Sequence, residues 1–314
     1  RTSSIKKDWI RNILRISMYQ IAFMKSDDKG VVWEATELAK KKFGVPVGKF
    51  VNGVLRSYIR ELENDILELK ENDKEDILLS YPRWVYDKIK QEYKEEANLF
   101  LESLKKIPYI SFRVNTLKYS EEEFEKLLES LNINIVKKVD TVYYLESGIL
   151  LYSDEFKDGK IIVQDASSYL SARNLNPKSN ESVLDTCSAP GGKTAVLGEL
   201  MKNEGELLAL DIYPHKLKLI EENCKKLGID FVRTVKMDAR KLNQQGKKFD
   251  KILVDAPCSG YGVLRKKPEA LYNKNIENVE ELSKLQFEIL ESAAQVLKDD
   301  GELVYSTCTI LKEE

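Results

Sequence analysis

The residues best suited to chemistry follow short apolar runs in the C-terminal half of the chain. One run, Ile252–Asp255, leads into Ala-Pro-Cys258, and another, Leu303–Cys308, ends on a cysteine. A thiolate is a strong nucleophile, and a carboxyl group can give or take a proton. Asp255, Cys258 and Cys308 therefore predict a thiol-dependent catalytic site, but their spacing does not say which thiol attacks.

A glycine-rich turn follows the apolar run that ends at Asp185. Gly191 and Gly192 let the backbone turn tightly, and the helix expected after them offers its N-terminal amides to a ligand. A Walker A loop would need glycine at Cys187, and the Rossmann G-x-G-x-x-G pattern is absent. Asp211 stands 19 residues after Gly192, where an acid can bind ribose hydroxyls. The pattern predicts a nucleoside-containing cofactor that is not a triphosphate.

The elements that must position these residues alternate between strands and helices from about residue 161. Strands are expected over 183–185, 207–211, 232–238, 252–255 and 303–308, and helices over 193–202, 214–227 and 278–298. The alternation predicts a parallel sheet with crossover helices. Ligands of such sheets bind beyond the carboxyl ends of the strands. Five chemically useful residues stand there: Asp185, Asp211, Asp238, Asp255 and Cys308.

The N-terminal part differs from this pattern. Apolar residues at helical spacing predict helices over 8–24, 31–43 and 47–61. Residues 1–60 hold 13 Lys and Arg against 5 Asp and Glu, a mild indication of nucleic-acid binding or simply of a solvated helical face. The acidic stretch 61–76 is expected to be a linker or an exposed helix end.

The middle of the chain predicts an α+β subdomain. We expect a strand over 110–115, an amphipathic helix over 120–131 and a further strand over 142–152.

Composition narrows the class of protein. Hydrophobic residues make up 42% and charged residues 32% of the 314, with a net charge of −2 and no apolar run of membrane-spanning length. The four cysteines show no C-x-x-C pair and have one histidine to join them, which argues against a metal site. Cys187 and Cys224 are expected to be buried hydrophobic residues. With no signal-peptide pattern, we expect a cytoplasmic protein that does not bind membranes. We also expect the protein to be a monomer.

Three motifs, in this order, resemble the RNA cytosine-5 methyltransferases of the NOL1/NOP2/Sun family: Ser188–Thr194, Asp255–Gly260 and Ser306–Thr309. Within the family, the chain is similar to the bacterial enzymes that modify 16S rRNA. In these a NusB-like RNA-binding domain precedes the catalytic part, and Trp9–Glu61 is similar to its second half.

The resemblance implies a multidomain α and α/β fold. A NusB-like helical domain is expected over 1–72, an α+β subdomain over 73–160 and a class I, Rossmann-like methyltransferase domain over 161–314. The helical domain would be incomplete at its N-terminus, and the methyltransferase domain would lack its C-terminal strands and leave a sheet edge exposed.

The resemblance also implies a cofactor, S-adenosyl-L-methionine, and residues that hold it. Asp238 would lie near the adenine, and Asp255 would line both the cofactor and the target base. The full cofactor set is Cys187, Ser188, Ala189, Pro190, Gly191, Gly192, Lys193, Asp211, Asp238 and Asp255.

By resemblance, Cys308 is the nucleophile, Cys258 releases the covalent adduct and Asp255 is the third catalytic residue. Cytosine C5 is a weak nucleophile, and addition of a thiolate to C6 makes it able to attack a sulfonium methyl group. A nearby acid must manage the charge at N3, and a base then removes the C5 proton.

The implied substrate is an unstacked cytosine in a 16S rRNA hairpin loop. The segments Phe112–Thr116 and Gln164–Ser167 match parts of the family that shape the RNA-facing cleft. Arg265, Lys266 and Lys267 are expected to contact RNA phosphate or to lie in a solvated loop. The alternatives are a methyltransferase that modifies tRNA or 23S rRNA, and a non-catalytic RNA-binding module of the antitermination type.

Overall fold

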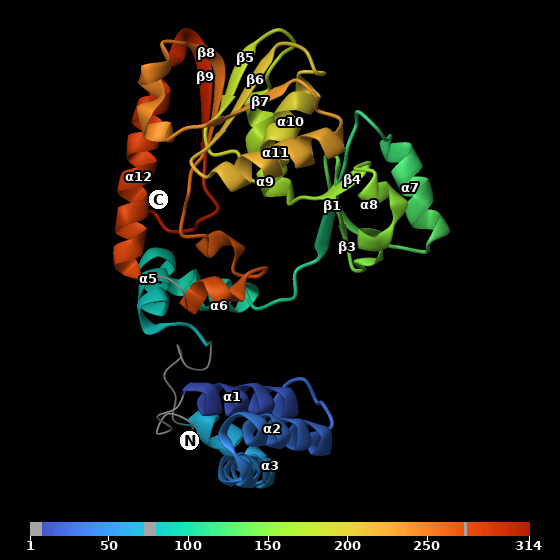
Figure 1. The fold of residues 1–314 in the computed structure, drawn as a ribbon, viewed down its shortest axis with the longest axis vertical. Helices are drawn as coiled ribbons and strands as arrows, with labels where there is room; N and C mark the ends of the chain where they lie inside the picture. The colour runs from blue at the N-terminus through green and yellow to red at the C-terminus, as the bar shows by residue number, and fades with distance from the viewer. Residues whose placement is uncertain (1–7, 72–79, 273–274) are drawn as a thin grey trace. The chain divides into compact units, whose positions relative to one another are not determined.

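The computed structural model describes residues 8–71, 80–272 and 275–314, of which 63–71 and 245 by their backbone alone. The chain divides into two compact units, Arg1–Tyr81 and Pro82–Glu314 (Figure 1). Within the described residues, no helix is both long and apolar enough to cross a membrane.

The described part of the first unit is helical. Its helices are α1 (Asp8–Ala22), α2 (Asp28–Phe43) and α3 (Val45–Glu71). The apolar positions repeat every three to four residues, so each helix turns one stripe toward a shared core around Leu14, Ala39 and Leu55. The acidic stretch that starts at residue 61 continues α3 as far as Glu71, and residues 72–76 lie outside the described part.

The first part of the second unit contains four α-helices and a small antiparallel sheet. The helices are α5 (Arg83–Tyr93), α6 (Ala97–Ser103), α7 (Glu121–Ser130) and α8 (Asp154–Lys157); the strands are β1 (Ile110–Val114), β2 (Ile135–Val139), β3 (Val142–Leu145) and β4 (Ile161–Val163). The strand order is β2-β3-β1-β4. Phe112, Phe124 and Tyr143 are fully buried between this sheet and α7.

The small sheet corrects three expectations. The strand expected over 142–152 ends at Leu145, because residues 149–152 form a 3-10 turn. Strand β2 was not expected at all. Strand β4 pairs with β1, so the small sheet continues three residues beyond the boundary expected at 160.

The remainder of the second unit is a five-stranded sheet with crossover helices. Its strands are β5 (Ser182–Asp185), β6 (Glu206–Asp211), β7 (Val232–Lys236), β8 (Phe249–Asp255) and β9 (Leu297–Ser306), and its helices are α9 (Ala166–Leu175), α10 (Gly192–Leu200), α11 (Pro214–Leu227) and α12 (Ile276–Gln295). The order is β7-β6-β5-β8-β9, and all neighbouring strands are parallel. The predicted parallel sheet is therefore confirmed.

Helices cover both faces of this sheet (Figure 1). Leu184, Leu208 and Ile252 pack against α12 on one face. Their neighbours Val183, Leu207 and Leu253 pack against α9 and α10 on the other. Because both faces are buried in the middle of the sheet, β5, β6 and the C-terminal part of β8 are continuous apolar runs and do not alternate with polar residues.

The chain order reverses beside β5. From β5 the chain moves outward through β6 and β7, and it then returns to β8 on the other side of β5. Such a switch point leaves a crevice at the carboxyl ends of the two central strands. The glycine-rich turn after β5 and Asp255 at the end of β8 both lie at this crevice.

Candidate active site

The two cysteines that follow β8 and β9 meet at the edge of the sheet. The Sγ atoms of Cys258 and Cys308 are 2.9 Å apart, and the backbone N–H of Cys308 donates to the sulfur of Cys258 at 3.2 Å. The side chain of Cys308 is exposed, whereas Cys258 is half-buried. Parallel pairing of β8 with β9 brings together residues that are 50 positions apart in the sequence.

The pairing makes the two thiols unequal. The hydrogen bond from the Cys258 thiol lowers the pKa of Cys308 to about 7, and the positive charge of Lys193 adds to this effect. The same hydrogen bond, together with burial, raises the pKa of Cys258. Burial raises the pKa values of Cys187 and Cys224 to about 12. Cys308 is therefore the cysteine with the greatest thiolate character near neutral pH.

Asp255 is held by two neighbours at the same strand ends. Lys193, in the first turn of α10, places its Nζ atom 2.6 Å from Oδ2 of Asp255. The Ser306 hydroxyl donates to Oδ1 of Asp255 at 2.9 Å. The carboxylate is thereby fixed in orientation beside the thiol pair.

A cleft of 930 Å³ opens over these residues. One wall carries Lys193, Asp255, Ser306 and Cys308, and Cys258 is not among the lining residues. Tyr109, Val136, Lys137 and Tyr144 from the region of the small sheet form another wall, and Asp165, Arg265 and Lys266 also contribute to the lining. Cys308 thus lines the cleft, whereas Cys258, which contacts it through sulfur, does not.

The basic loop Arg265–Lys267 lies beside the cleft, and two of its three side chains already have partners within the chain. The Arg265 guanidinium donates to the backbone oxygens of Lys106 and Ile107, at 3.1 and 3.3 Å. Lys266 pairs with Asp165 at 2.5 Å. Lys267 is exposed in the same loop.

The turn between β5 and α10 is built without side-chain capping of the helix. Gly191 has a φ of +101°, in the left-handed region, and α10 has no side-chain cap hydrogen bond at its N-terminus. Its first amides are therefore not capped by a side chain. The side chain of Asn223 donates to the carbonyl oxygen of Pro190 at 2.7 Å and supports the turn from α11.

Asp185 does not face the cleft. It is buried, accepts a hydrogen bond from the Thr194 hydroxyl at 2.7 Å, and has its pKa raised to about 6 by burial. This aspartate links the end of β5 to the first turn of α10.

Asp211 is the last residue of β6, and Asp238 follows β7. The backbone N–H of Tyr213 donates to Asp211 at 2.9 Å, and Lys216 lies 3.7 Å from its other oxygen. The Arg240 guanidinium holds Asp238 at 2.7 Å and lowers the pKa of that carboxyl. Strand β7 ends at Lys236, so Asp238 lies two residues past the strand and caps the turn Ala239–Gln245.

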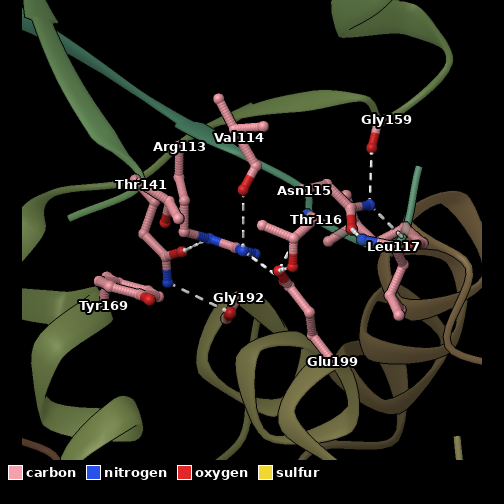
Figure 2. Close-up of polar contacts among 12 residues, drawn as sticks. Arg113, Val114, Asn115, Thr116, Leu117, Thr141, Gly159, Tyr169, Gly192 and Glu199 are labelled. Carbon is pink, nitrogen blue, oxygen red and sulfur yellow. Dashed lines mark hydrogen bonds and ion pairs between the residues drawn. The ribbon is translucent and has the colours of Figure 1, made fainter. Parts of the chain in front are cut away.

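Within the segment Phe112–Thr116, the residues from Phe112 to Asn115 are buried, Thr116 is exposed, and none of the five is among the residues that line the cleft. Arg113 is fully buried between β1 and α10, where its guanidinium pairs with Glu199 (Figure 2). Its Nε–H donates to Gln164 at 2.7 Å, and Gln164 donates to the carbonyl oxygen of Gly192 at 3.2 Å. The small sheet is therefore connected by side chains to the glycine-rich turn.

Replacement of Gln164 tests this connection. Gln164→Leu leaves a buried Arg113 N–H without its acceptor, so the free energy of unfolding should fall by about 1–3 kcal/mol in urea denaturation. Gln164→Glu keeps an acceptor for Arg113, loses the donor to Gly192 and adds a negative charge beside the Arg113–Glu199 pair. It should retain more of the stability than Gln164→Leu, and equal losses in the two variants would contradict the assignment.

One supporting residue gave no signal in the sequence. Gln286 of α12 is buried, donates to the carbonyl oxygen of Pro257 at 2.9 Å and accepts from the Tyr305 hydroxyl at 3.0 Å. It holds the loop that carries Cys258. A glutamine within an amphipathic helix looks like any solvated position until the fold places it.

The lowered pKa of Cys308 has a direct consequence for its reactivity. Because thiolate forms as pH rises through about 7, the rate of alkylation of Cys308 by iodoacetamide should rise across that range and then level off. In Cys258→Ala the midpoint should move upward, toward the ordinary value of about 8.5. Cys224→Ala, which changes a buried thiol of the core, should leave the midpoint in place. An unchanged midpoint in Cys258→Ala would contradict the role of the sulfur pair.

Among the residues that the structure describes, no group of three or more His, Cys, Asp or Glu side chains is arranged to hold a metal ion.

Comparisons with known proteins agree with this architecture. The model of the family described as 16S rRNA methyltransferase RsmB/F matches residues 172–314. The NusB family model matches residues 1–60, and an RsmF/B-like ferredoxin-like domain model matches residues 81–154. The succession of NusB-like, α+β and methyltransferase parts expected from the sequence is thereby confirmed.

Individual relatives cover nearly the whole chain. The probable ribosomal RNA small subunit methyltransferase B of Bacillus subtilis is 38% identical over 321 residues, which span 98% of this chain and 70% of that protein. A methyltransferase homologue from Pyrococcus horikoshii has a TM-score of 0.68 and 33% identity, over 76% of this chain and 77% of that one. NSun6 from the same organism, solved with SFG, has a TM-score of 0.68 and 26% identity, over 76% of this chain and 85% of that one. The chain belongs to the RsmB/F family of 16S rRNA methyltransferases.

Proposed function

We propose that this chain transfers a methyl group from S-adenosylmethionine to C5 of a cytosine in 16S rRNA, through a covalent bond between Cys308 and C6. The observation that carries the proposal is the meeting of Cys308, Cys258, Asp255 and Lys193 at one edge of the 930 Å³ cleft. Membership of a methyltransferase family leaves no support for a purely binding module of the antitermination type.

The residues at the switch point fit S-adenosylmethionine. The N-terminal amides of α10 lack a side-chain cap, and Gly191 gives the turn a shape that other residues rarely adopt. Asp211 stands at the end of β6, where an acid can bind the ribose hydroxyls, and Asp238 stands after β7 for the adenine side. Residues 187–193 would hold the remainder. When bound, the cofactor supplies the methyl group, activated on a sulfonium; SFG in the NSun6 structure is an analogue of it.

Cys308 supplies the nucleophile in this proposal. Its exposed thiolate faces the cleft and adds to C6 of the base, which makes C5 nucleophilic enough to accept the methyl group. Asp255 holds and returns the proton at N3, with its carboxylate oriented by Lys193 and Ser306. Cys258 lies directly behind Cys308 and assists its release after the C5 proton has left.

The walls of the cleft suit a single unstacked nucleotide. Tyr109 and Tyr144 present aromatic side chains for stacking, and Lys137, Arg265 and Lys266 present positive charge for the RNA backbone. Lys266 would exchange its partner Asp165 for phosphate. The basic segment of residues 1–60 adds contacts that are sensitive to salt and insensitive to base sequence.

A labelling experiment tests the proposal. The enzyme is incubated with methyl-labelled S-adenosylmethionine and, in separate reactions, with unmodified 16S rRNA, 23S rRNA and tRNA. Label is expected at C5 of a cytosine in 16S rRNA. Label only in 23S rRNA or tRNA would assign the chain to one of those substrates instead, and no label in any RNA would overturn the proposal.

Gly262 provides a test of the position of Cys308. A Cβ atom on Gly262 would lie 2.7 Å from the carbonyl oxygen of Cys308, to which the Gly262 N–H itself donates. Gly262→Ala should displace Cys308 and slow methyl transfer by up to about 10²-fold, because small misplacements of reacting groups are costly. Gly148→Ala, whose nearest new contact is an ordinary 3.6 Å, should transfer at the original rate. Equal rates for both variants would contradict this geometry.

A further inference from the structure

The sulfur pair has a second chemical capacity besides catalysis. The Sγ atoms of Cys258 and Cys308 already lie 2.9 Å apart, whereas the sulfurs of a disulfide lie about 2.0 Å apart. Closing the pair therefore requires a movement of roughly 1 Å, within reach of small side-chain rotations. Both cysteines follow strand ends and lie outside β8 and β9, so the sheet does not oppose the movement.

We propose that Cys258 and Cys308 form a peroxide-sensitive modification site that closes to an intramolecular disulfide and reversibly stops methyl transfer. Cys308 faces the cleft and is reached first by a small oxidant, and Cys258 stands behind it as the resolving thiol. A resolving cysteine next to an accessible, thiolate-rich one is the arrangement that favours disulfide formation over further oxidation.

The reaction with hydrogen peroxide balances in two steps. The Cys308 thiolate attacks one peroxide oxygen, the O–O bond breaks, and hydroxide leaves and is protonated to water; the sulfur becomes a sulfenic acid. The Cys258 sulfur then attacks the sulfenic sulfur, the S–O bond breaks, and a second water leaves as the S–S bond forms. The two thiols together lose two protons and two electrons, which the peroxide takes up.

The other cysteines are poor competitors for this reaction. Cys224 is fully buried and packs in the core beside Ile220, and Cys187 packs against the core of the sheet. Burial holds their thiols in the protonated form, which is the unreactive one. Oxidation should therefore be selective for the pair.

The effect on methyl transfer rests on the proposed function, since it needs Cys308 to be the nucleophile. A disulfide occupies the sulfur that would attack C6, and a dithiol reductant restores it by exchange. RNA bound in the cleft should cover Cys308 and slow its oxidation.

The test is peroxide treatment of the reduced chain, followed by peptide mapping without reductant and by a methyl-transfer assay. We expect one disulfide that joins Cys258 to Cys308, loss of transfer to background, and recovery after dithiothreitol. Stable sulfinic acid on Cys308, a disulfide that includes Cys187 or Cys224, a disulfide between two chains, or no change at either sulfur would each overturn the proposal.

Two variants separate this chemistry from the catalytic assignment. In Cys258→Ser the same treatment, carried out at about pH 8.5 where Cys308 ionises without the Cys258 thiol, should leave Cys308 as a sulfenic acid that dimedone traps and that proceeds to sulfinic acid. A protected Cys308 there would also overturn the proposal. Cys224→Ser should behave as the parent chain in the mapping. If the pair closes but the reduced chain methylates no RNA, the proposed function fails and the redox chemistry stands. If the reduced chain methylates RNA and the pair does not close, the redox proposal fails and the proposed function stands.

Discussion

Replacement of Cys308 by alanine should reduce methyl transfer to RNA on the order of 10⁴- to 10⁶-fold, as removal of a catalytic nucleophile does. The side chain is exposed and lies past the end of β9, so its loss should leave the fold intact. Binding of S-adenosylmethionine should also persist, because residues 187–193 belong to a different turn. Transfer of labelled methyl groups and cofactor binding by calorimetry measure the two effects separately.

Cys308→Ser provides the matched control for this substitution. Serine keeps the size and the polar character of the side chain but is a far weaker nucleophile at neutral pH. It should lose transfer as severely as alanine does. Substantial activity in Cys308→Ser would mean that the site needs a polar group there and does not use covalent catalysis.

Replacement of Cys258 by alanine should make the covalent complex between enzyme and RNA accumulate, whereas replacement of Cys308 should prevent its formation. Addition of Cys308 to the base remains possible, but the group that assists release is gone, so enzyme joined to RNA should accumulate as a shifted band on a denaturing gel. Because Cys258 also lowers the pKa of Cys308, the comparison belongs at about pH 8.5, where an ordinary cysteine is substantially ionised.

The double variant Cys258→Ala/Cys308→Ala tells whether the accumulated complex depends on Cys308. The shifted band should disappear in it. A band that persists in the double variant would place the covalent bond on another residue. A band in Cys308→Ala alone would mean that the roles of the two cysteines are exchanged.

The parallel sheet could be predicted because its strands are buried on both faces. Val183–Asp185, Leu207–Asp211 and Ile252–Asp255 are therefore continuous apolar runs that end in a charged residue. The helix 214–227 was placed correctly, since Pro214 starts it and Gly228 ends it. Strand β2 was not predicted because it lies at the sheet edge with nearly every side chain exposed, so its sequence does not alternate between apolar and polar residues.

The segment around β1 shows why pattern alone misplaces polar residues. Its alternation of apolar and polar side chains predicts one face in contact with solvent or a ligand, yet Arg113 and Asn115 are as buried as Phe112. The second face is covered by α9, whose Tyr169 ring lies against the Arg113 guanidinium, and by α10, whose Glu199 pairs with it. Gln164, just after β4, accepts a hydrogen bond from the same guanidinium. A buried cation becomes tolerable only with such partners, and Gln164 and Glu199 lie 51 and 86 positions away in the sequence.

Part of the candidate site could also be predicted from the sequence, and part could not. That Asp255 and Cys308 reach one edge of the sheet follows from the strand pattern. The 2.9 Å sulfur contact, the Lys193–Asp255 pair and the support from Gln286 depend on side chains from separate elements, and only the fold brings them together. The choice between the two thiols, left open by spacing, now has a physical basis in exposure and in the lowered pKa of Cys308.

The most direct test of the covalent assignment uses 16S rRNA in which cytidine is replaced by 5-fluorocytidine. With fluorine at C5 there is no proton to remove once the methyl group has been transferred, so the thiol cannot be eliminated. The reaction should therefore stop at the methylated covalent enzyme–RNA complex. Protease and nuclease digestion followed by mass spectrometry then identifies the modified peptide. The structure leads us to expect the nucleotide on Cys308, with Cys258 unmodified. A nucleotide on Cys258, or no covalent complex while methyl transfer proceeds on normal RNA, would contradict the central claim.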